Sequence, residues 1–170
     1  MRKYLMPDLI LPTYLDVTPQ LCRELGIRAI LSDIDNTLAP YEQPRSDEHI
    51  RAWLADLNEA GISVALISNN HADRVEQFNA DLGLVAYPDA GKPFGKFLRR
   101  AMADLGSDPS NTAMLGDQLL TDALAGHLQG MKVLIVPPIR DKRTAFVRFK
   151  RWLERPVIRR YEKKYGGYKT

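Results

Sequence analysis

The sequence predicts an α/β fold with a Rossmann-like, doubly wound and mostly parallel sheet. From residue 28 onward, short runs rich in Ile, Leu and Val alternate with segments of helical periodicity. Strands that alternate with helices in this way are joined by right-handed crossovers, so that the strands run parallel and the helices cover both faces. The connecting segments are short, so we expect no large cap domain.

Five apolar runs are predicted strands, at residues 29–32, 62–67, 84–87, 112–115 and 132–136. Each is a short continuous run, as expected of strands that are buried in a parallel sheet.

Four helices are predicted between these strands, at residues 45–60, 72–82, 93–105 and 121–128. The first has apolar residues at helical spacing, and we expect Ser46 to be its N-cap. Pro93 is suited to the first turn of the third helix, because its missing N–H needs no partner there.

The composition is typical of a single domain in a reducing compartment. The chain has 170 residues and one cysteine, Cys22, which excludes a disulfide within the chain. No apolar stretch reaches the roughly 18 to 20 residues of a membrane span. Pro7, Asp8 and Pro12 interrupt the N-terminal apolar stretch, so we expect a cytoplasmic protein without a removed leader.

The charge is distributed unevenly. Residues 140–170 carry 12 Lys and Arg against 3 Asp and Glu, a net charge of +9, whereas residues 1–139 carry 12 against 18, a net charge of −6. We therefore divide the chain into a catalytic domain with a short N-terminal lead segment, residues 1–139, and a basic amphipathic tail, residues 140–170.

Three interpretations of this tail remain open. Phe146, Phe149 and Leu153 recur at helical spacing among basic residues, and we expect Pro156 to interrupt the pattern. The tail is a last helix packed on the core, or a peripheral contact with anionic lipid at the inner face of the membrane. The third and least favoured interpretation is a contact with RNA or the ribosome.

Polar side chains follow the predicted strands where each strand ends. Asp33 and Asp35 follow the first strand, Ser68 follows the second, and Asp117 follows the fourth. Lys92 directly precedes the third predicted helix. Ligand sites of doubly wound sheets lie beyond the carboxyl ends of the strands, so we expect these side chains to meet there.

This set of residue types suits phosphoryl transfer. Crowded carboxylates raise one another's pKa values unless a cation balances them, and Mg²⁺ prefers oxygen ligands. A lysine and a hydroxyl stabilise the charge on a transferring phosphoryl group. One carboxylate can act as a nucleophile and a second can transfer the proton.

The same residues resemble a known family. DIDNTL at 33–38, Ser68, Lys92 in GKP and GDQLLTD at 116–122 resemble, in order and spacing, the four motifs of the haloacid dehalogenase (HAD) superfamily. With the N-terminal segment and the basic tail, the chain resembles the small, capless subclass IIIA phosphatases of the YqeG type, which are phosphatidylglycerophosphatase-like.

The resemblance implies a role for each acidic residue of the first and last motifs. Asp33 corresponds to the nucleophile and a Mg²⁺ ligand. Asp35 corresponds to the general acid and base, with its backbone carbonyl on the metal. Asp117 corresponds to the remaining carboxylate ligand. Asp122 either supports the metal shell or holds Lys92.

It also implies the phosphate-binding residues. Ser68 and Lys92 correspond to phosphate ligands, and Asn69 is placed to donate its backbone N–H to phosphate. Thr37 is expected to fix the turn after Asp35 through its hydroxyl.

The function implied is Mg²⁺-dependent hydrolysis of phosphomonoesters through an aspartyl-phosphate intermediate. Because a capless site is open, the expected substrate is phosphatidylglycerophosphate or another bulky phosphomonoester. The alternatives are a nucleic-acid- or ribosome-associated protein that keeps the fold, a receiver-like phosphoacceptor, and a phosphatase of a phosphoprotein or nucleotide. The sequence makes no prediction of the oligomeric state.

Overall fold

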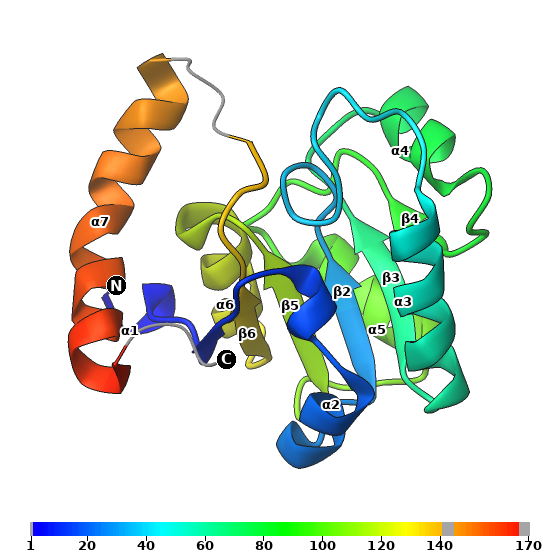
Figure 1. Cartoon of the computed structure of the whole chain (residues 1–170), viewed down its shortest axis with the longest axis horizontal. Helices are drawn as coiled ribbons and strands as arrows, with labels where there is room; N and C mark the ends of the chain where they lie inside the picture. The colour runs from blue at the N-terminus through cyan, green and yellow to red at the C-terminus, as the bar shows by residue number, and fades with distance from the viewer. Residues whose placement is uncertain (1, 141–144, 167–170) are drawn as a thin grey trace.

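The computed structural model describes residues 2–140 and 145–166. Its centre is one parallel sheet of six strands in the order β1-β6-β5-β2-β3-β4 (Figure 1). The strands are β1 (Leu9–Ile10), β2 (Ala29–Ser32), β3 (Ser63–Ile67), β4 (Val85–Tyr87), β5 (Thr112–Gly116) and β6 (Lys132–Ile135). The predicted fold class is confirmed, and β2 lies in the middle of the sheet between β5 and β3.

Helices cover both faces of the sheet, because successive strand residues point to opposite sides. The helices are α1 (Arg2–Leu5), α2 (Pro19–Leu25), α3 (Glu48–Glu59), α4 (Ala72–Asn79), α5 (Lys96–Asp104), α6 (Leu124–Leu128) and α7 (Ala145–Tyr165). On β2, Ile30 packs in the apolar cluster that holds α2, α3 and α4 side chains. Its neighbour Leu31 packs in the opposite cluster, with α5 and α6.

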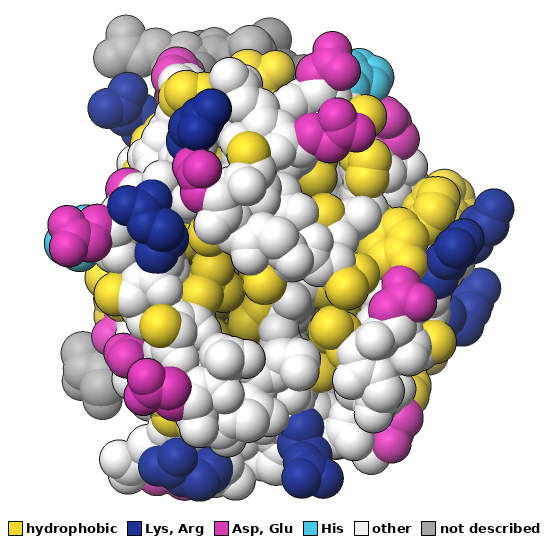
Figure 2. Space-filling model, turned by 90° about the vertical axis from the view of Figure 1, so that its right-hand side faces the viewer, with side chains coloured by type: hydrophobic (Ala, Val, Ile, Leu, Met, Phe, Trp, Pro, Cys, Tyr) yellow, Lys and Arg dark blue, Asp and Glu magenta, His cyan; other side chains and the backbone are white. Residues whose placement is uncertain are grey.

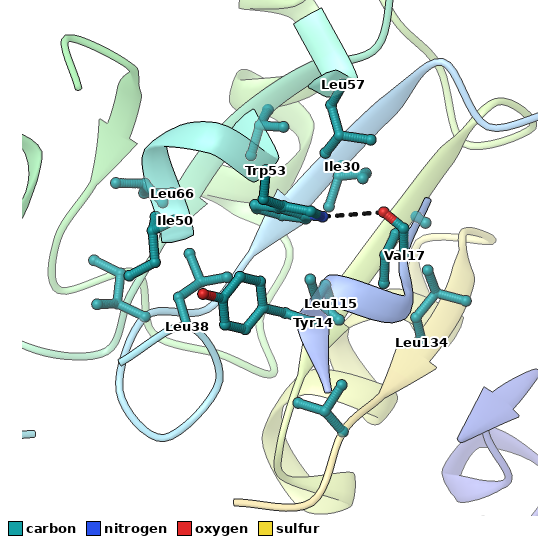
Figure 3. Packing of buried hydrophobic residues seen from close by; sticks show 14 of the residues in the cluster. Tyr14, Val17, Ile30, Leu38, Ile50, Trp53, Leu57, Leu66, Leu115 and Leu134 are labelled. Carbon is teal, nitrogen blue, oxygen red and sulfur yellow. Dashed lines mark hydrogen bonds between the residues drawn. The ribbon is translucent and has the colours of Figure 1, made fainter. Parts of the chain in front are cut away.

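The N-terminal lead segment is part of the core. Tyr14, in a 3₁₀ turn (η1, Tyr14–Asp16), packs edge-on against Trp53 of α3, with ring centroids 5.2 Å apart. The Trp53 indole donates a hydrogen bond to the Val17 carbonyl at 3.0 Å (Figure 3). The strand β1 has two residues and the turn η1 three, which is too few for a periodic pattern, so neither was predicted.

Two predicted helix starts are wrong. Helix α3 begins after Asp47, whose carboxylate accepts from the Ile50 N–H at 2.9 Å, and Ser46 is not the N-cap. Helix α5 begins at Lys96 and not at Pro93. In the last predicted helix, a π-helical turn (η2, Leu119–Ala123) precedes α6.

Helix α7 continues through Pro156 to Tyr165, so the expected interruption does not occur. Tyr161 is buried, and its hydroxyl accepts a hydrogen bond from the Ile10 N–H of β1 at 3.1 Å. The side chains of Phe146 and Phe149 lie outside the described part of the structure. From residue 152 onward α7 is thus anchored to the core, as in the first interpretation of the tail.

The basic side chains in the described part of α7 are exposed to solvent. The exposed ones in its described part are Arg155, Arg159, Arg160, Lys163 and Lys164. By contrast, the face at the right of Figure 1 carries Lys, Arg, Asp and Glu side chains interspersed around apolar ones (Figure 2). Between α1 and α7 lies a cavity of about 780 Å³, lined in part by Val157, Arg160 and Lys164.

Glu154 of α7 is buried against the η2 turn. Its carboxylate accepts from the backbone N–H groups of Leu119 and Leu120 at 2.9 and 3.3 Å. We expect Glu154→Ala to lower the free energy of unfolding by about 2–3 kcal/mol, because two backbone donors lose their acceptor. Denaturant unfolding measures this, with exposed Glu162→Ala as the control. Equal stability of the two variants would show that Glu154 does not anchor α7.

A partly buried ion pair ties the N-terminal segment to α6. The His127 ring lies 2.8 Å from the Tyr4 carbonyl and 3.2 Å from the Asp8 carboxylate. The hydrogen bond with Asp8 raises the pKa of His127, although burial acts to lower it. Burial acts to raise the pKa of Asp8, but hydrogen bonds from His127 and the Val133 N–H lower it overall.

These opposite shifts predict a window of pH in which the pair stabilises the fold. The contribution of protonated His127 is complete below its unfolded pKa, about 6.5, and is lost as the pH rises through the higher folded value. The stabilisation contributed by ionised Asp8 is lost as the pH falls through the lowered pKa that Asp8 has in the folded state. We expect His127→Asn to be less stable than wild type by up to about 1 kcal/mol near pH 5.5 and by less at pH 8.5. Unfolding at the two pH values measures this, and a difference that grows with pH would contradict it.

Candidate active site

The predicted site residues lie at one edge of the sheet because their strands are neighbours. Asp33 directly follows β2, Ser68 follows β3, and Asp117 follows β5. Since these strands are parallel, their carboxyl ends meet at the same edge, where the loop after β2 is seen in Figure 1. Asp33 is fixed further by its backbone N–H, which donates to the Leu115 carbonyl of β5 at 2.8 Å.

The DIDNTL segment forms a tight turn. The backbone N–H groups of residues 37, 38 and 39 all donate to the Ile34 carbonyl at 3.0 to 3.2 Å. Asn36 has a positive φ of 65°, which asparagine tolerates better than most residues. The hydroxyl of Thr37 lies 3.5 Å from the Asp33 carboxylate, at the limit of a hydrogen bond. The Thr37 hydroxyl thus contacts Asp33 and not the turn after Asp35.

Lys92 lies at the centre of the site. Its ammonium is 2.7 Å from the Asp33 carboxylate, 2.7 Å from that of Asp122 and 2.9 Å from the Ile67 carbonyl. These contacts use all three donors of the ammonium. Burial alone would lower the pKa of Lys92, but the charges of Asp122 and Asp33 raise it above its ordinary value. Lys92 is therefore a constant positive charge.

The backbone of Lys92 is held by the Asn69 side chain. The Asn69 amide oxygen accepts from the Lys92 N–H at 2.8 Å, and its nitrogen donates to the Lys92 carbonyl at 3.2 Å. This pair of bonds fixes the chain before α5. The side chain of Asn69 thus positions Lys92, a role that the sequence analysis did not anticipate.

Three buried carboxylates form a cluster suited to a metal ion. One oxygen each of Asp33, Asp117 and Asp122 lies within 4.8 Å of the others. Gly116 allows this approach, because a Cβ there would lie 2.3 Å from Asp122 Cγ. Lys92 neutralises one of the three charges, and a divalent cation would neutralise the other two. The donor set, all carboxylate oxygen, fits a hard divalent ion.

The crowding of carboxylates in this cluster affects the pKa of Asp33. Its pKa is raised to about 6, by burial first and also by the charges of Asp122 and Asp35, although Lys92 lowers it. A bound cation would oppose this rise.

Ser68 and Asp35 complete the set. Ser68 is buried, and its hydroxyl accepts from the Asn70 N–H at 3.0 Å. The Asp35 carboxylate is not in the cluster of three. It accepts one hydrogen bond from Arg74 of α4 and one from Asn70 in the loop after β3, both at 3.0 Å. The metal contact expected of Asp35 is through its backbone carbonyl and stays a prediction.

Arg74 was not among the site residues predicted from the sequence. A signal was present, because α4 starts just beyond the site edge at the end of β3, and Arg74 is on its first turn. A basic residue in that turn is therefore near the carboxylates that follow the adjacent strand β2.

Comparisons with known proteins agree with this geometry. Residues 89–143 match the model of the HAD-hydrolase-like family. The chain is 31% identical over 164 residues to the probable phosphatase YqeG of Bacillus subtilis (strain 168), across 96% of this chain and 95% of that protein.

Solved structures of low identity share the fold. A putative HAD superfamily (subfamily III A) hydrolase from Legionella pneumophila has a TM-score of 0.52 at 18% identity, covering 85% of this chain and 89% of that one. The core domain of a putative phosphoglycolate phosphatase from Streptococcus pneumoniae TIGR4 has a TM-score of 0.50 at 19% identity, covering 75% and 96%.

The similarity to the Bacillus protein extends over nearly the whole of both chains, and the structure has the α/β core without a large cap in its described residues. The resemblance found in the sequence is confirmed. The chain belongs to the haloacid dehalogenase superfamily, among the YqeG-type phosphatases, and is a phosphoric monoester hydrolase.

Proposed function

We propose that this site hydrolyses phosphomonoesters in a Mg²⁺-dependent reaction through an aspartyl-phosphate at Asp33. The observation that carries the proposal is the position of Lys92, whose buried ammonium joins Asp33 to Asp122 beside Asp117. In this proposal, one fixed positive charge and the ligands for a divalent cation surround a single carboxylate. Phosphoryl transfer requires both kinds of charge next to the nucleophile.

Asp33 and Asp117 would hold the Mg²⁺, with the Asp35 carbonyl or the Asp122 carboxylate as a further ligand. When bound, the ion neutralises charge on the phosphoryl oxygens and keeps Asp33 ionised at neutral pH. Asp122 also holds Lys92, which was one of its two expected roles.

The chain's own residues carry the bond changes. An oxygen of Asp33 attacks phosphorus, and the bond from phosphorus to the leaving oxygen breaks as Asp35, in its protonated form, donates its proton to that oxygen. Asp35 then accepts a proton from a water molecule that attacks the phosphorus of the aspartyl-phosphate. Inorganic phosphate leaves, and the Asp33 carboxylate is regenerated. The Ser68 hydroxyl binds a phosphoryl oxygen, and the fixed positive charge of Lys92 beside Asp33 stabilises the negative charge of the phosphoryl group.

The substrate that we propose is a bulky phosphomonoester in an anionic membrane, of the phosphatidylglycerophosphate class. In the part of the chain that the structure describes, helices lack the combination of length and apolar character that a membrane span needs. The contact that we propose is a peripheral one. The exposed basic side chains of α7 supply it, at roughly 1 kcal/mol for each residue near an anionic leaflet.

The test compares a lipid phosphomonoester in anionic vesicles with a soluble alkyl phosphate. The variant Arg155→Gln/Arg159→Gln/Lys163→Gln removes exposed charges from α7 and keeps the buried Glu154 and Tyr161. We expect it to lose more than tenfold in kcat/KM on vesicles at low salt and nothing on the soluble substrate. Equal activity of wild type and variant on vesicles would contradict the membrane contact. A preference for nucleotides or a phosphoprotein over the lipid would contradict the substrate class.

A further inference from the structure

The Asp35 carboxylate is held at both oxygens by residues that follow β3. Arg74 donates from Nε and Nη2 to Asp35 Oδ1 at 3.2 and 3.0 Å. Asn70 donates from its side-chain amide to Asp35 Oδ2 at 3.0 Å. Charge-assisted bonds of this kind are short and directional, and together they restrict the carboxylate to one orientation.

Arg74 is itself held in place. Its Nη1 donates to the Pro44 carbonyl at 3.2 Å, and its guanidinium carbon lies 5.3 Å from the centre of the Phe78 ring. Phe78 is fully buried in the core, and the Arg74 side chain is 11% exposed. The guanidinium therefore links three parts of the chain: the turn after β2, the segment before α3, and α4.

We propose that Arg74 is the positioning residue for Asp35, with Asn70 in a lesser role on the second oxygen. The proposal rests on the acid and base role given to Asp35 above. Arg74 acts through the carboxyl group of Asp35: it binds Oδ1 and so holds the group in the orientation from which protonated Oδ2 delivers its proton to the leaving oxygen. Proton transfer requires hydrogen-bond distance and alignment in the transition state, which a freely rotating side chain seldom has.

A positioning role has a distinctive kinetic signature. An alkoxide is a poor leaving group and requires the proton, whereas nitrophenolate leaves without it. The value of kcat/KM reports the steps up to release of the alcohol. Loss of Arg74 therefore lowers kcat/KM for alkyl phosphates and leaves kcat/KM for nitrophenyl phosphate nearly unchanged.

The experiment measures kcat/KM of Arg74→Met for alkyl and aryl phosphates over a range of leaving groups. Methionine keeps an unbranched side chain and removes the guanidinium. We expect a loss of about 10²-fold for the alkyl substrates, of the order that general acid catalysis contributes. For nitrophenyl phosphate we expect a change of less than about threefold on the same basis. Arg45→Met is the matched control, since Arg45 is an exposed arginine paired with Asp81 at 3.4 Å.

The double variant Asp35→Asn/Arg74→Met decides whether Arg74 acts through Asp35. We expect it to be no worse on alkyl substrates than Asp35→Asn alone, because the two residues act as a unit. Losses in kcat/KM that add in the double variant would overturn the proposal. So would an Arg74→Met variant that loses kcat/KM equally on alkyl and aryl substrates, or that loses none.

One further result separates this proposal from the proposed function. The informative quantity is kcat/KM for alkyl phosphates divided by kcat/KM for aryl phosphates. If Asp35→Asn leaves this ratio unchanged, the role proposed for Asp35 itself is wrong. If Arg74→Met does not fold, as judged by its unfolding midpoint, Asn70→Ala replaces it. We expect Asn70→Ala to lower the same ratio by a smaller factor, and an unchanged ratio would overturn the proposal.

Discussion

Asp33→Asn is expected to lower kcat for phosphomonoester hydrolysis by about 10⁴-fold or more, as removal of a nucleophile does in other covalent mechanisms. An amide does not form the acyl phosphate that the proposed mechanism requires. Its oxygen can still accept the bond from Lys92 that Asp33 accepts at 2.7 Å, so the site keeps its shape. Initial rates of phosphate release at saturating Mg²⁺ measure the loss.

The matched control for this variant is Asp56→Asn, a change of the same kind on the exposed side of α3. It should retain wild-type kcat. An Asp33→Asn variant within tenfold of wild type would show that another group attacks phosphorus.

The second large effect is on stability. Lys92→Met should lower the free energy of unfolding by about 3–5 kcal/mol, because two buried carboxylates lose the positive charge that balances them. Both carboxylates, Asp33 and Asp122, are 2.7 Å from the ammonium. Saturating Mg²⁺ should restore part of this loss, since a cation that binds only the folded state stabilises it. Denaturant unfolding with and without Mg²⁺ measures both effects.

Lys96→Met is the matched control, because Lys96 is an exposed lysine at the start of α5, shortly after Lys92 in the chain. It should unfold at the wild-type denaturant concentration. If the two variants are equally stable, the charge on Lys92 does not hold the carboxylates together.

The central strands and the motif residues were predictable for one physical reason. A strand buried in a parallel sheet is a continuous apolar run, and the first polar residues after it mark the edge where ligands bind. Asp33, Ser68 and Asp117 are found in this way. Lys92 does not directly follow a strand. It was predicted from its place before a helix and from the family motif.

Contacts between distant parts of the chain were not predictable from local patterns. Arg74 and Asp35 are 39 positions apart, and Glu154 is 35 positions from Leu119. The start of α5 was misjudged for the same reason, because the side chain of Asn69 fixes the backbone of Lys92 in a turn before the helix. None of these pairings has a periodicity or a short spacing. The sequence held a signal for Arg74 alone, whose place in the first turn of α4, after β3, puts it near the site edge without identifying its partner.

The acyl phosphate at Asp33 is the intermediate on which the proposed mechanism depends, and it can be trapped. Asp35→Asn should form it from nitrophenyl phosphate and hydrolyse it slowly, because the base that activates water is missing. Acid quenching within milliseconds, followed by borohydride reduction, converts an aspartyl-phosphate to homoserine, which mass spectrometry locates. The prediction is a burst of about one nitrophenolate for each enzyme and homoserine at position 33. Steady turnover without a burst, or homoserine at another aspartate, would contradict the mechanism.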